Sequence, residues 1–450
     1  MLEIQGRGVR LCDGLTRRSF LKLGSLGLAG LTLPRFLQAN EQRRAGSRAK
    51  AVILYWMAGG PSHIDTYDMK PNAPSQVRGP FRPTATSVPG MQFCELMPRQ
   101  ARIADKIALV RSLTHSNFDH FDAAHWVQTG HHEPRVMGRG QPFPSQGSVV
   151  SMVRGPNHPG MPAYVCIPEA WGSARGFYQH ASFLGAAHNP LSSGGVAHSE
   201  RYHINRPQLV PGPDVTLSRV EDRRQLQRLI QNTARALDSQ PATQNMDQYY
   251  RRAFELITSP RVQAAFDVSR EPLALQERYG RHAWGQAALL ARRLVEAGVT
   301  FVTVNHFEAE IDWWDDHKDI EANLRRRLPI YDQALGTLIE DLHDRGLGED
   351  VLVAAFGEFG RGPTIDAQAG RGHWARAWHA LLSGGGVHGG RVHGSTTANG
   401  GEPADGAASP ADLLATIYHA LGMDLDVTVT DRQNRPIRLL DGARPIRELF

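Results

Sequence analysis

Histidine, carboxylate and arginine residues are concentrated in a few short segments of this sequence. Imidazole suits zinc and carboxylate suits manganese or calcium, so segments that combine the two are candidates for binding a divalent metal ion. The chain has only three cysteines, none in a closely spaced pair, so histidine and carboxylate would have to supply the ligands. Five of the 20 histidines fall within 18 positions: His115, His120, His125, His131 and His132.

His120 is the candidate that local structure singles out in this histidine-rich segment. If the residues from Asp122 onward are helical, His120 lies at the N-terminus of the helix, where anions and metal-bound oxygens are favoured. We therefore expect His120 to be a metal ligand. The alternative is a polar loop whose histidines only cap and hydrogen-bond.

Further candidate ligands stand in three later segments. Asp315 and His317 are two positions apart, so in a loop both side chains can turn toward one ion. Glu358 and His373 stand in glycine-rich loops, which allow a tight backbone around them. Two alternatives remain open: a solvated acidic turn around Asp315, and an ion pair between Glu358 and Arg361 that braces a turn.

Candidate nucleophilic and anion-binding residues accompany these ligands. Arg361 and Arg371 could each donate two parallel hydrogen bonds to an oxyanion. Ser62 is a candidate nucleophile and Asp65 a candidate metal ligand in the segment Gly-Gly-Pro-Ser-His-Ile-Asp, whose paired glycines permit close backbone approach. The same segment also fits a Pro-directed turn in which Asp65 caps a helix.

The elements that precede these segments must bring them together. Strands alternating with helices predict an α/β fold with a mainly parallel sheet, in which sites form beyond the carboxyl ends of strands. Most of the candidate residues follow a predicted strand. The apolar runs predicted as strands are residues 51–57, 107–110, 163–167, 299–304, 351–356 and 380–382, and the helical patterns are residues 273–297, 330–342 and 410–421.

The first 39 residues have the layout of an export signal. They carry a net charge of +4, which is most of the +5 of the whole chain. Adjacent Arg17 and Arg18 precede Phe-Leu-Lys, and an apolar run follows and ends at Pro34, which is typical of a twin-arginine signal peptide. We predict a twin-arginine-type signal peptide over residues 1–39, a linker over 40–50 and one domain over 51–450, in a protein exported to the periplasm or the extracellular space.

Composition excludes several other classes of protein. The chain after the signal carries a net charge of only +1, too little for a surface that binds nucleic acid. No run reaches the roughly 18 consecutive apolar residues of a membrane-spanning helix. Cys94 and Cys166 could form one disulfide in an oxidising compartment, and their pairing stays open, as does the oligomeric state.

The motifs together resemble those of a known family. The blocks that carry the resemblance are Gly-Gly-Pro-Ser-His-Ile-Asp-Thr-Tyr-Asp, Trp-Asp-Asp-His, Gly-Glu-Phe-Gly-Arg, Gly-Arg-Gly-His-Trp and Gly-Gly-Gly-Val-His-Gly-Gly. They are similar to the exported domain-of-unknown-function family DUF1501, within the alkaline phosphatase-like superfamily of sulfatases and phosphatases. The resemblance covers nearly the whole chain after the signal. It implies an alkaline phosphatase-like three-layer sandwich, whose mainly parallel central sheet has helices on both faces.

The resemblance also implies a metal centre at the carboxyl ends of the strands. Asp315 and His317 match the later metal-binding Asp and His of the superfamily, and His373 matches its final His. Glu358 takes the place of the Asp in an Asp-His pair. Counting back from a Thr-Gly pair puts His120 in the place of the nucleophile.

The sequence also departs from the superfamily pattern. Gly59 and Gly60 stand where the first metal-binding Asp is expected, so Asp65 would have to substitute for it. Phe359 replaces the His of the Asp-His pair, and the sulfatase-type Cys-x-Pro-x-Arg motif is missing. The centre around Asp315 is therefore the better kept part of the site, and formylglycine chemistry is not expected.

These observations lead to two hypotheses about function. The first is an exported hydrolase of phosphate or sulfate esters that uses divalent metal ions (zinc, manganese or calcium) and acts on a small-molecule or carbohydrate ester. Metal-activated water or a side chain would be the nucleophile, and Arg361 and Arg371 would stabilise the oxyanion. The second is a non-catalytic metal-binding or scaffolding protein that retains the fold, suggested by the departures from the superfamily pattern.

Overall fold

The structure is a computed structural model that describes residues 49–133, 135–136, 140–170, 178–194, 259–305, 314–431 and 433–450. The predicted signal peptide lies outside the described residues, as does the linker up to Arg48. Residues 49–450 form one compact unit. No helix in the described part of the chain is long and apolar enough to cross a membrane.

A sheet of eight strands forms the centre of this unit. All six predicted strands are present, and the run predicted over residues 351–356 has those bounds in the structure. Every pairing in the sheet is parallel except those of β11, which is antiparallel to both of its neighbours. In spatial order the strands are β12 (Arg391–His393), β4 (Ala108–Leu113), β11 (Trp378–Ser383), β8 (Val351–Phe356), β1 (Ala51–Trp56), β7 (Phe301–Asn305), β5 (Tyr164–Ile167) and β6 (Leu191–Ser192).

The direction of β11 changes how one segment reaches the site. The parallel strands β1, β4, β7 and β8 end at one edge of the sheet, and β11 begins at that same edge. The loop that carries His373 therefore arrives at this edge before a strand, whereas the other candidate loops leave it after one.

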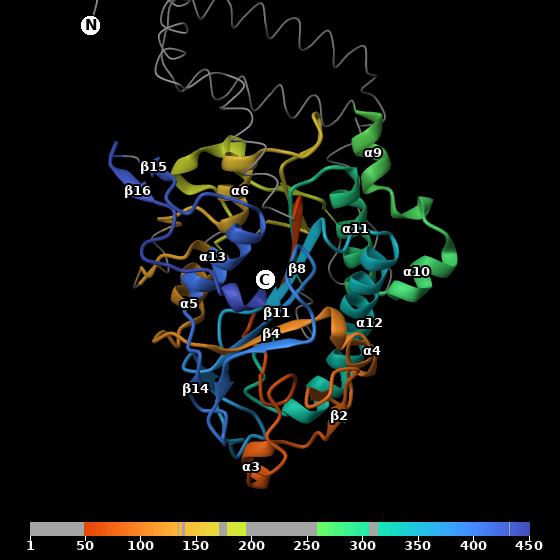
Figure 1. Ribbon diagram of the computed structural model, residues 1–450, viewed down its shortest axis with the longest axis vertical. Coiled ribbons are helices and arrows are strands. Elements are labelled where there is room, and N and C mark those ends of the chain that lie inside the picture. The colour runs from red at the N-terminus through yellow and green to blue at the C-terminus, as the bar shows by residue number, and fades with distance from the viewer. Residues whose placement is uncertain are drawn as a thin grey trace, which may run out of the picture. The chain divides into compact units, whose positions relative to one another are not determined.

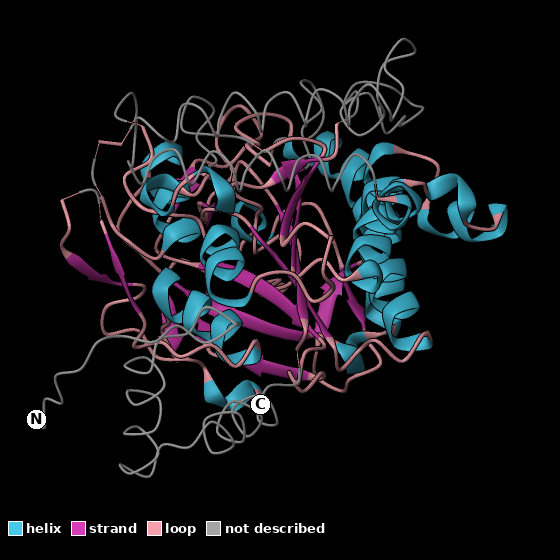
Figure 2. Ribbon diagram, turned by 90° about the horizontal axis from the view of Figure 1, so that it is seen from above, coloured by secondary structure: helices cyan, strands magenta, loops and turns pink. Residues whose placement is uncertain are grey.

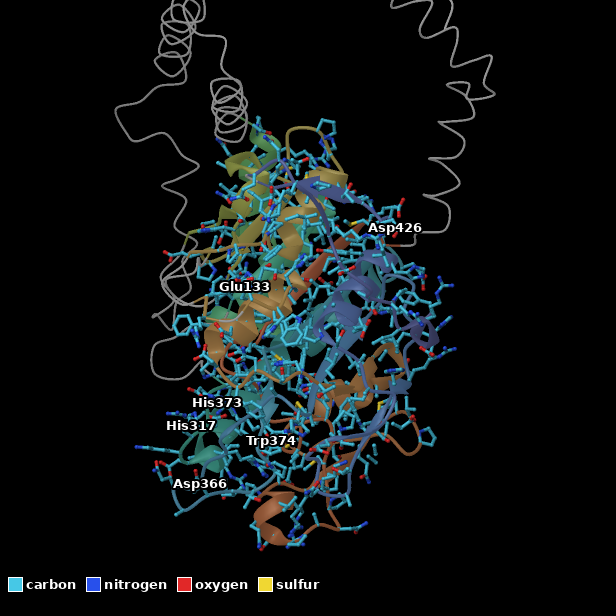
Figure 3. The ribbon with its side chains drawn as sticks, turned by 90° about the vertical axis from the view of Figure 1, so that its left-hand side faces the viewer. Glu133, His317, Asp366, His373, Trp374 and Asp426 are labelled. Atoms are coloured by element: carbon cyan, nitrogen blue, oxygen red, sulfur yellow. The ribbon has the colours of Figure 1, made fainter. Side chains whose placement is uncertain are left out.

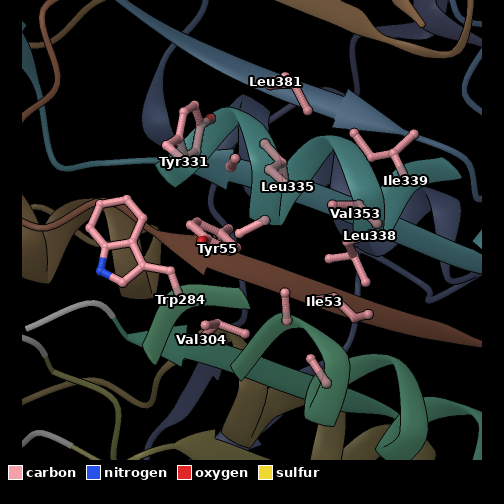
Figure 4. Packing of buried hydrophobic residues seen from close by; sticks show 14 of the residues in the cluster. Ile53, Tyr55, Trp284, Val304, Tyr331, Leu335, Leu338, Ile339, Val353 and Leu381 are labelled. Atoms are coloured by element: carbon pink, nitrogen blue, oxygen red, sulfur yellow. The ribbon is translucent and has the colours of Figure 1, made fainter. Parts of the chain in front are cut away.

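Alternate residues of the central strands enter two separate cores. Ile53 and Tyr55 of β1 belong to one core, and Val52, Leu54 and Trp56 belong to the other. Because both faces of the strand are covered, its sequence is a continuous apolar run with no polar alternation. Figure 4 shows the first core, where Ile53 and Tyr55 lie between side chains of two neighbouring helices.

Helices cover both faces of the sheet and complete three layers (Figures 1 and 2). This is the architecture that the resemblance to the alkaline phosphatase-like superfamily implies. The helices of the first core are α4 (Pro98–Arg102), α9 (Pro260–Phe266), α10 (Leu273–Tyr279), α11 (Ala283–Ala297) and α12 (Ile320–Asp344). Those of the second core are α5 (His120–Thr129), α6 (Gln146–Arg154) and α13 (Pro410–Ala420).

Two helices differ from the patterns read in the sequence. The helix predicted over residues 273–297 is divided into α10 (Leu273–Tyr279) and α11, because Gly280 has a φ of 98° and His282 caps the second helix. Helix α12 is longer than predicted and continues through Pro329. In contrast, α13 begins with the predicted cap, in which Ser409 and Asp412 hydrogen-bond reciprocally.

Short elements surround the sheet, and one of them carries His373. They are α3 (Ser75–Arg78) and the antiparallel pairs β2 (Pro83–Ala85) with β3 (Gln92–Cys94), β9 (Gly360–Arg361) with β10 (His373–Trp374), β13 (Ser395–Thr396) with β14 (Pro403–Asp405), and β15 (Thr428–Thr430) with β16 (Pro436–Arg438).

The two cysteines of the domain do not form a disulfide. Cys94 is a buried free thiol in the first core, and Cys166 is one in the second core. The sheet therefore lies between them. Burial raises the pKa of each thiol to about 12, so neither is a ready thiolate nucleophile.

Candidate metal centre

His120 is the first residue of α5, as the sequence predicts. The carboxylate of Asp119 caps this helix by accepting from the main-chain nitrogens of Phe121 and Asp122. The helix start holds the His120 ring at the edge of the sheet. Its Nδ1 lies 2.6 Å from Oε1 of Glu358, and its Nε2 lies 3.3 Å from Oδ2 of Asp315.

Asp315 is held in place by its two chain neighbours. The ring of Trp314 is fully buried, and its main-chain nitrogen donates to Ala58 just after β1. Asp316 forms a buried ion pair with Arg327, with 2.8 and 3.2 Å between the paired atoms. The solvated acidic turn considered above is therefore absent here: both neighbours are buried, and Asp315 alone, 29% exposed, faces the cluster.

His317 and His373 meet at the same carboxylate. Nε2 of His317 lies 3.0 Å from Oδ1 of Asp315, Nε2 of His373 lies 3.2 Å from it, and the two nitrogens are 2.8 Å apart. Figure 3 shows the two histidines side by side on one side of the molecule. We call His120, Asp315, His317 and His373 the metal centre.

The geometry of these residues fits a metal ion. One ligand atom from each of His120, Asp315 and His373 lies within 4.8 Å of the others. Nδ1 of His373 lies 2.8 Å from the carbonyl oxygen of Phe118, and donation to that oxygen leaves the lone pair on Nε2. Donation from Nδ1 of His120 to Glu358 likewise leaves the lone pair on Nε2 of His120. Metal-binding histidines are commonly oriented by such outer partners.

Glu358 adds a second observation in favour of a cation. Its Oε1 accepts from Nδ1 of His120 and, at 2.8 Å, from the main-chain nitrogen of Gly59. Its Oε2 is buried and has no hydrogen-bond partner among the described residues. A bare buried carboxylate oxygen is costly, and a nearby cation would compensate it. Nε2 of His115 donates to the main-chain oxygen of Glu358 at 2.7 Å and fixes its backbone.

Charge is strongly paired in this cluster. Burial lowers the pKa of His120, but hydrogen bonds to Asp315 and Glu358 outweigh burial and raise the pKa to about 9. Burial opposes ionisation of Asp315, yet hydrogen bonds with His120 and His373 and the charge of Arg361 hold its pKa well below its usual range. A metal ion would take the place of the His120 proton, because a ligating imidazole must be neutral.

The guanidinium of Arg361 forms its hydrogen bonds with atoms of the protein itself. Its Nε donates to the carbonyl of Gly60 at 2.9 Å, and its Nη2 contacts the carbonyl of Gly59 and Oδ1 of Asp315. Its side chain is fully buried. The ion pair considered from the sequence therefore forms with Asp315 and not with Glu358, and it braces the glycine turn against the metal centre.

The paired glycines allow this close packing. Gly59 and Gly60 have φ values of 101° and 78°. A Cβ on Gly59 would lie 2.7 Å from the main-chain nitrogen of Asp315, and one on Gly60 would lie 2.5 Å from the ring of Phe359. The two glycines thus allow close approach of the backbone, as expected, but the neighbouring atoms belong to the protein itself.

Ser62, Asp65 and Arg371 lie together in a separate buried network. Nε of Arg371 is 2.8 Å from Oδ2 of Asp65 and Nη2 is 3.2 Å from Oδ1, while the hydroxyl of Ser62 donates to Oδ2 at 2.5 Å. All three side chains are fully buried. Asp65 caps no helix, and the structure joins these residues to one another and not to the metal centre.

Two further residues belong to the site, and the sequence analysis gave neither of them a role in it. Phe118 acts through its main-chain carbonyl, which any residue type possesses. Phe359 packs its ring against both His120 and His373, with 4.8 Å from its centre to that of each imidazole. Its position in the Gly-Glu-Phe-Gly-Arg block was the available hint.

Fold and site together define an α/β sandwich with a histidine and carboxylate centre at the carboxyl edge of its sheet. The chain belongs to the family described as "Protein of unknown function (DUF1501)", whose model matches residues 49–450. A search of curated proteins gives no match.

Several solved structures are remotely similar. The structure titled Ps i-CgsB has a TM-score of 0.39 at 12% identity, over 84% of this chain and 72% of that one. PsFucS1 sulfatase from Pseudoalteromonas sp. has a TM-score of 0.37 at 11% identity, over 89% and 72%. The lipoteichoic acid synthase LtaP from Listeria monocytogenes has a TM-score of 0.33 at 10% identity, over 84% and 73%. No conclusion about the reaction follows from likenesses this remote.

Proposed function

We propose that this protein is an exported, metal-dependent hydrolase of phosphate or sulfate esters. The observation that carries the proposal is the convergence of His120, Asp315, His317 and His373 at the edge of the sheet. The centre is open to substrate, since the side chain of His317 is 45% exposed. The twin-arginine motif at the start of the chain supports action outside the cytoplasm.

His120, Asp315 and His373 would hold the metal ion, with His317 on the exposed side. A divalent ion bound there would supply Lewis acidity to the ester oxygen and would lower the pKa of water toward neutrality. Three imidazoles and one carboxylate favour zinc or manganese over calcium. Glu358 and the Phe118 carbonyl orient two of the imidazoles, and Arg361 fixes Asp315.

Water is the nucleophile that the surroundings favour. Ser62 is fully buried and donates its hydroxyl to Asp65, so it does not face a substrate. Arg371 is bound to the same carboxylate. The charge of Arg361 is compensated by Asp315, so the bound metal ion would supply the positive charge that attracts an anionic ester. The substrate that fits is a small-molecule or carbohydrate anionic ester.

A metal-binding protein without turnover is the second candidate. The observation in its favour is that Arg361 and Arg371 are fully buried and donate to protein atoms. Neither is presented to an oxyanion in the way that the hydrolase hypothesis expected from the sequence. This candidate predicts bound metal and no release of phosphate or sulfate.

The test is to purify the exported chain, measure its metal content, and assay nitrophenyl phosphate and nitrophenyl sulfate. We expect bound zinc or manganese and a rate that chelation abolishes and metal restores. His373→Ala should lose both metal and rate, while His388→Ala, at an exposed histidine outside the centre, should keep both. A chain that neither contains metal nor responds to added zinc or manganese would overturn the proposal.

A further inference from the structure

A cavity of about 920 Å³ adjoins the metal centre. His373 belongs to both, and the next residue, Trp374, forms part of the cavity wall. Figure 3 shows Trp374 beside the two labelled histidines. We propose that this cavity binds the alcohol part of the ester and that it is built for an uncharged sugar residue. The inference rests on the proposed function, because it assigns a place to the part of the substrate that the metal centre does not hold.

The volume of the cavity exceeds what the reacting group needs. A phosphate or sulfate group would occupy the metal centre itself. Binding cavities of about 300–1,000 Å³ accommodate organic ligands the size of drug molecules. The cavity next to His373 therefore has room for an alcohol part of the ester that is as large as a sugar ring.

Trp374 provides a fixed aromatic wall. Its indole nitrogen donates to the carbonyl of Gly401 at 2.6 Å, and the ring of Phe118 packs edge-on against it with 5.8 Å between ring centres. The indole is half-buried and held in one orientation. A sugar ring carries C–H groups on its faces and hydroxyl groups around its rim, so one face can pack on such a flat ring.

Polar groups line the remaining wall. Oδ1 of Asn399 accepts from the hydroxyl of Thr397 at 2.8 Å and from the main-chain nitrogen of Gly401 at 3.0 Å. These bonds order the loop and leave the Asn399 amide nitrogen to donate to a ligand. Hydroxyl groups of a sugar both donate and accept, which matches a wall of this kind.

The charges of the cavity cancel. Nη1 of Arg376 lies 2.9 Å from Oε1 of Glu402, and both side chains are 57% exposed. The guanidinium also lies over the Trp374 ring, 6.0 Å from its centre. Glu402 neutralises the charge of Arg376, so the cavity does not favour an ester whose alcohol part carries a negative charge of its own. This favours a neutral sugar over a nucleotide or an acidic sugar.

Binding of methyl glucoside, measured by saturation-transfer NMR on the full purified chain, tests the inference without any turnover. We expect methyl glucoside to bind and methyl glucuronide to bind more weakly. Trp374→Leu should weaken glucoside binding about tenfold or more, and Trp374→Phe, which keeps a flat ring, should retain most of it. Glu402→Gln should shift the preference toward the glucuronide, because it leaves Arg376 uncompensated.

Hydrolysis gives a second readout. Trp374→Leu should raise KM for a glucose ester of phosphate or sulfate at least about tenfold more than it raises KM for methyl phosphate or methyl sulfate. Failure of the proposed function would abolish all four reactions but leave glucoside binding intact. Absence of glucoside binding, equal binding by Trp374→Leu, or preference of the parent chain for the glucuronide would each overturn the inference.

Discussion

Two clusters of charged side chains lie at the same edge of the sheet and differ in how their charges are satisfied. In the buried network, both oxygens of the Asp65 carboxylate accept hydrogen bonds, two from Arg371 and one from Ser62 in total. In the metal centre, Nε2 of His317 and Nε2 of His373 lie 2.8 Å apart, and the nearby Glu358 keeps a buried oxygen without a hydrogen-bond partner among the residues described. The buried network is satisfied by the protein itself, whereas the Glu358 oxygen favours a cation at the metal centre.

Breaking the buried network should have the largest effect on stability. Asp65→Ala would leave the Arg371 guanidinium buried without its carboxylate, which costs about 3–5 kcal/mol. Urea unfolding in the presence of a chelator would measure this loss without a contribution from bound metal. Asp315→Ala should cost less, because Asp315 is 29% exposed, whereas Asp65 is fully buried.

A double variant provides the control for this prediction. Asp65→Leu combined with Arg371→Met removes both charges and should recover much of the stability lost in Asp65→Ala. Equal losses for Asp65→Ala and Asp315→Ala would show that the two clusters do not differ in the way described.

Glu358→Gln tests whether Glu358 supports metal binding at the metal centre. The variant removes the carboxylate that orients His120, and loss of such an outer partner lowers metal affinity about 10- to 100-fold. Titration with zinc, read by calorimetry, would measure the change. Glu321→Gln, at an exposed pair with Arg325 on α12, should leave the affinity unchanged. Zinc affinity equal to that of the parent chain would count against the role assigned to Glu358.

Histidines outside the metal centre extend the comparison, and their effect is small near neutral pH and grows only as the pH falls. His379 is fully buried on β11, and burial, with the charges of His63 and Arg111, lowers its pKa to about 3. As pH falls below about 6.5, the unfolded chain binds a proton at this position that the folded chain does not. Stability should therefore fall by up to about 1.4 kcal/mol per pH unit until the folded pKa is reached.

His379→Leu should remove this contribution, so its stability should decline less steeply between about pH 6 and pH 4. Urea unfolding across that range would measure the slope. His388→Leu, at an exposed position, serves as the matched control and should keep the slope of the parent. A slope unaffected by His379→Leu would contradict the prediction.

The sequence predicted the architecture well because buried parallel strands are continuous apolar runs. It missed the end of β4, since Arg111 and Ser112 interrupt the apolar pattern before Leu113. It also could not give the direction of β11, because direction depends on pairing with β4 and β8, which are distant in the chain. The break at Gly280 is a local feature that the helical period concealed.

Prediction of the candidate site succeeded in part. The sequence placed Asp315 and His317 at a strand end, and the structure puts them beside His120 and His373. Residue type alone could not distinguish the partners of Arg361. Its carbonyl acceptors at Gly59 and Gly60 become neighbours only in the folded chain, about 300 positions away.

The antiparallel strand has a consequence for biosynthesis. Because β11 lies between β4 and β8, the β9–β10 hairpin that presents His373 is anchored at the edge of the sheet only once β11 has been synthesised and has paired with both strands. His120, Asp315 and His317 are thus synthesised before the segment that brings His373 to them. A metal ion bound there, as proposed above, would be acquired late in folding, after His373 has joined His120, Asp315 and His317.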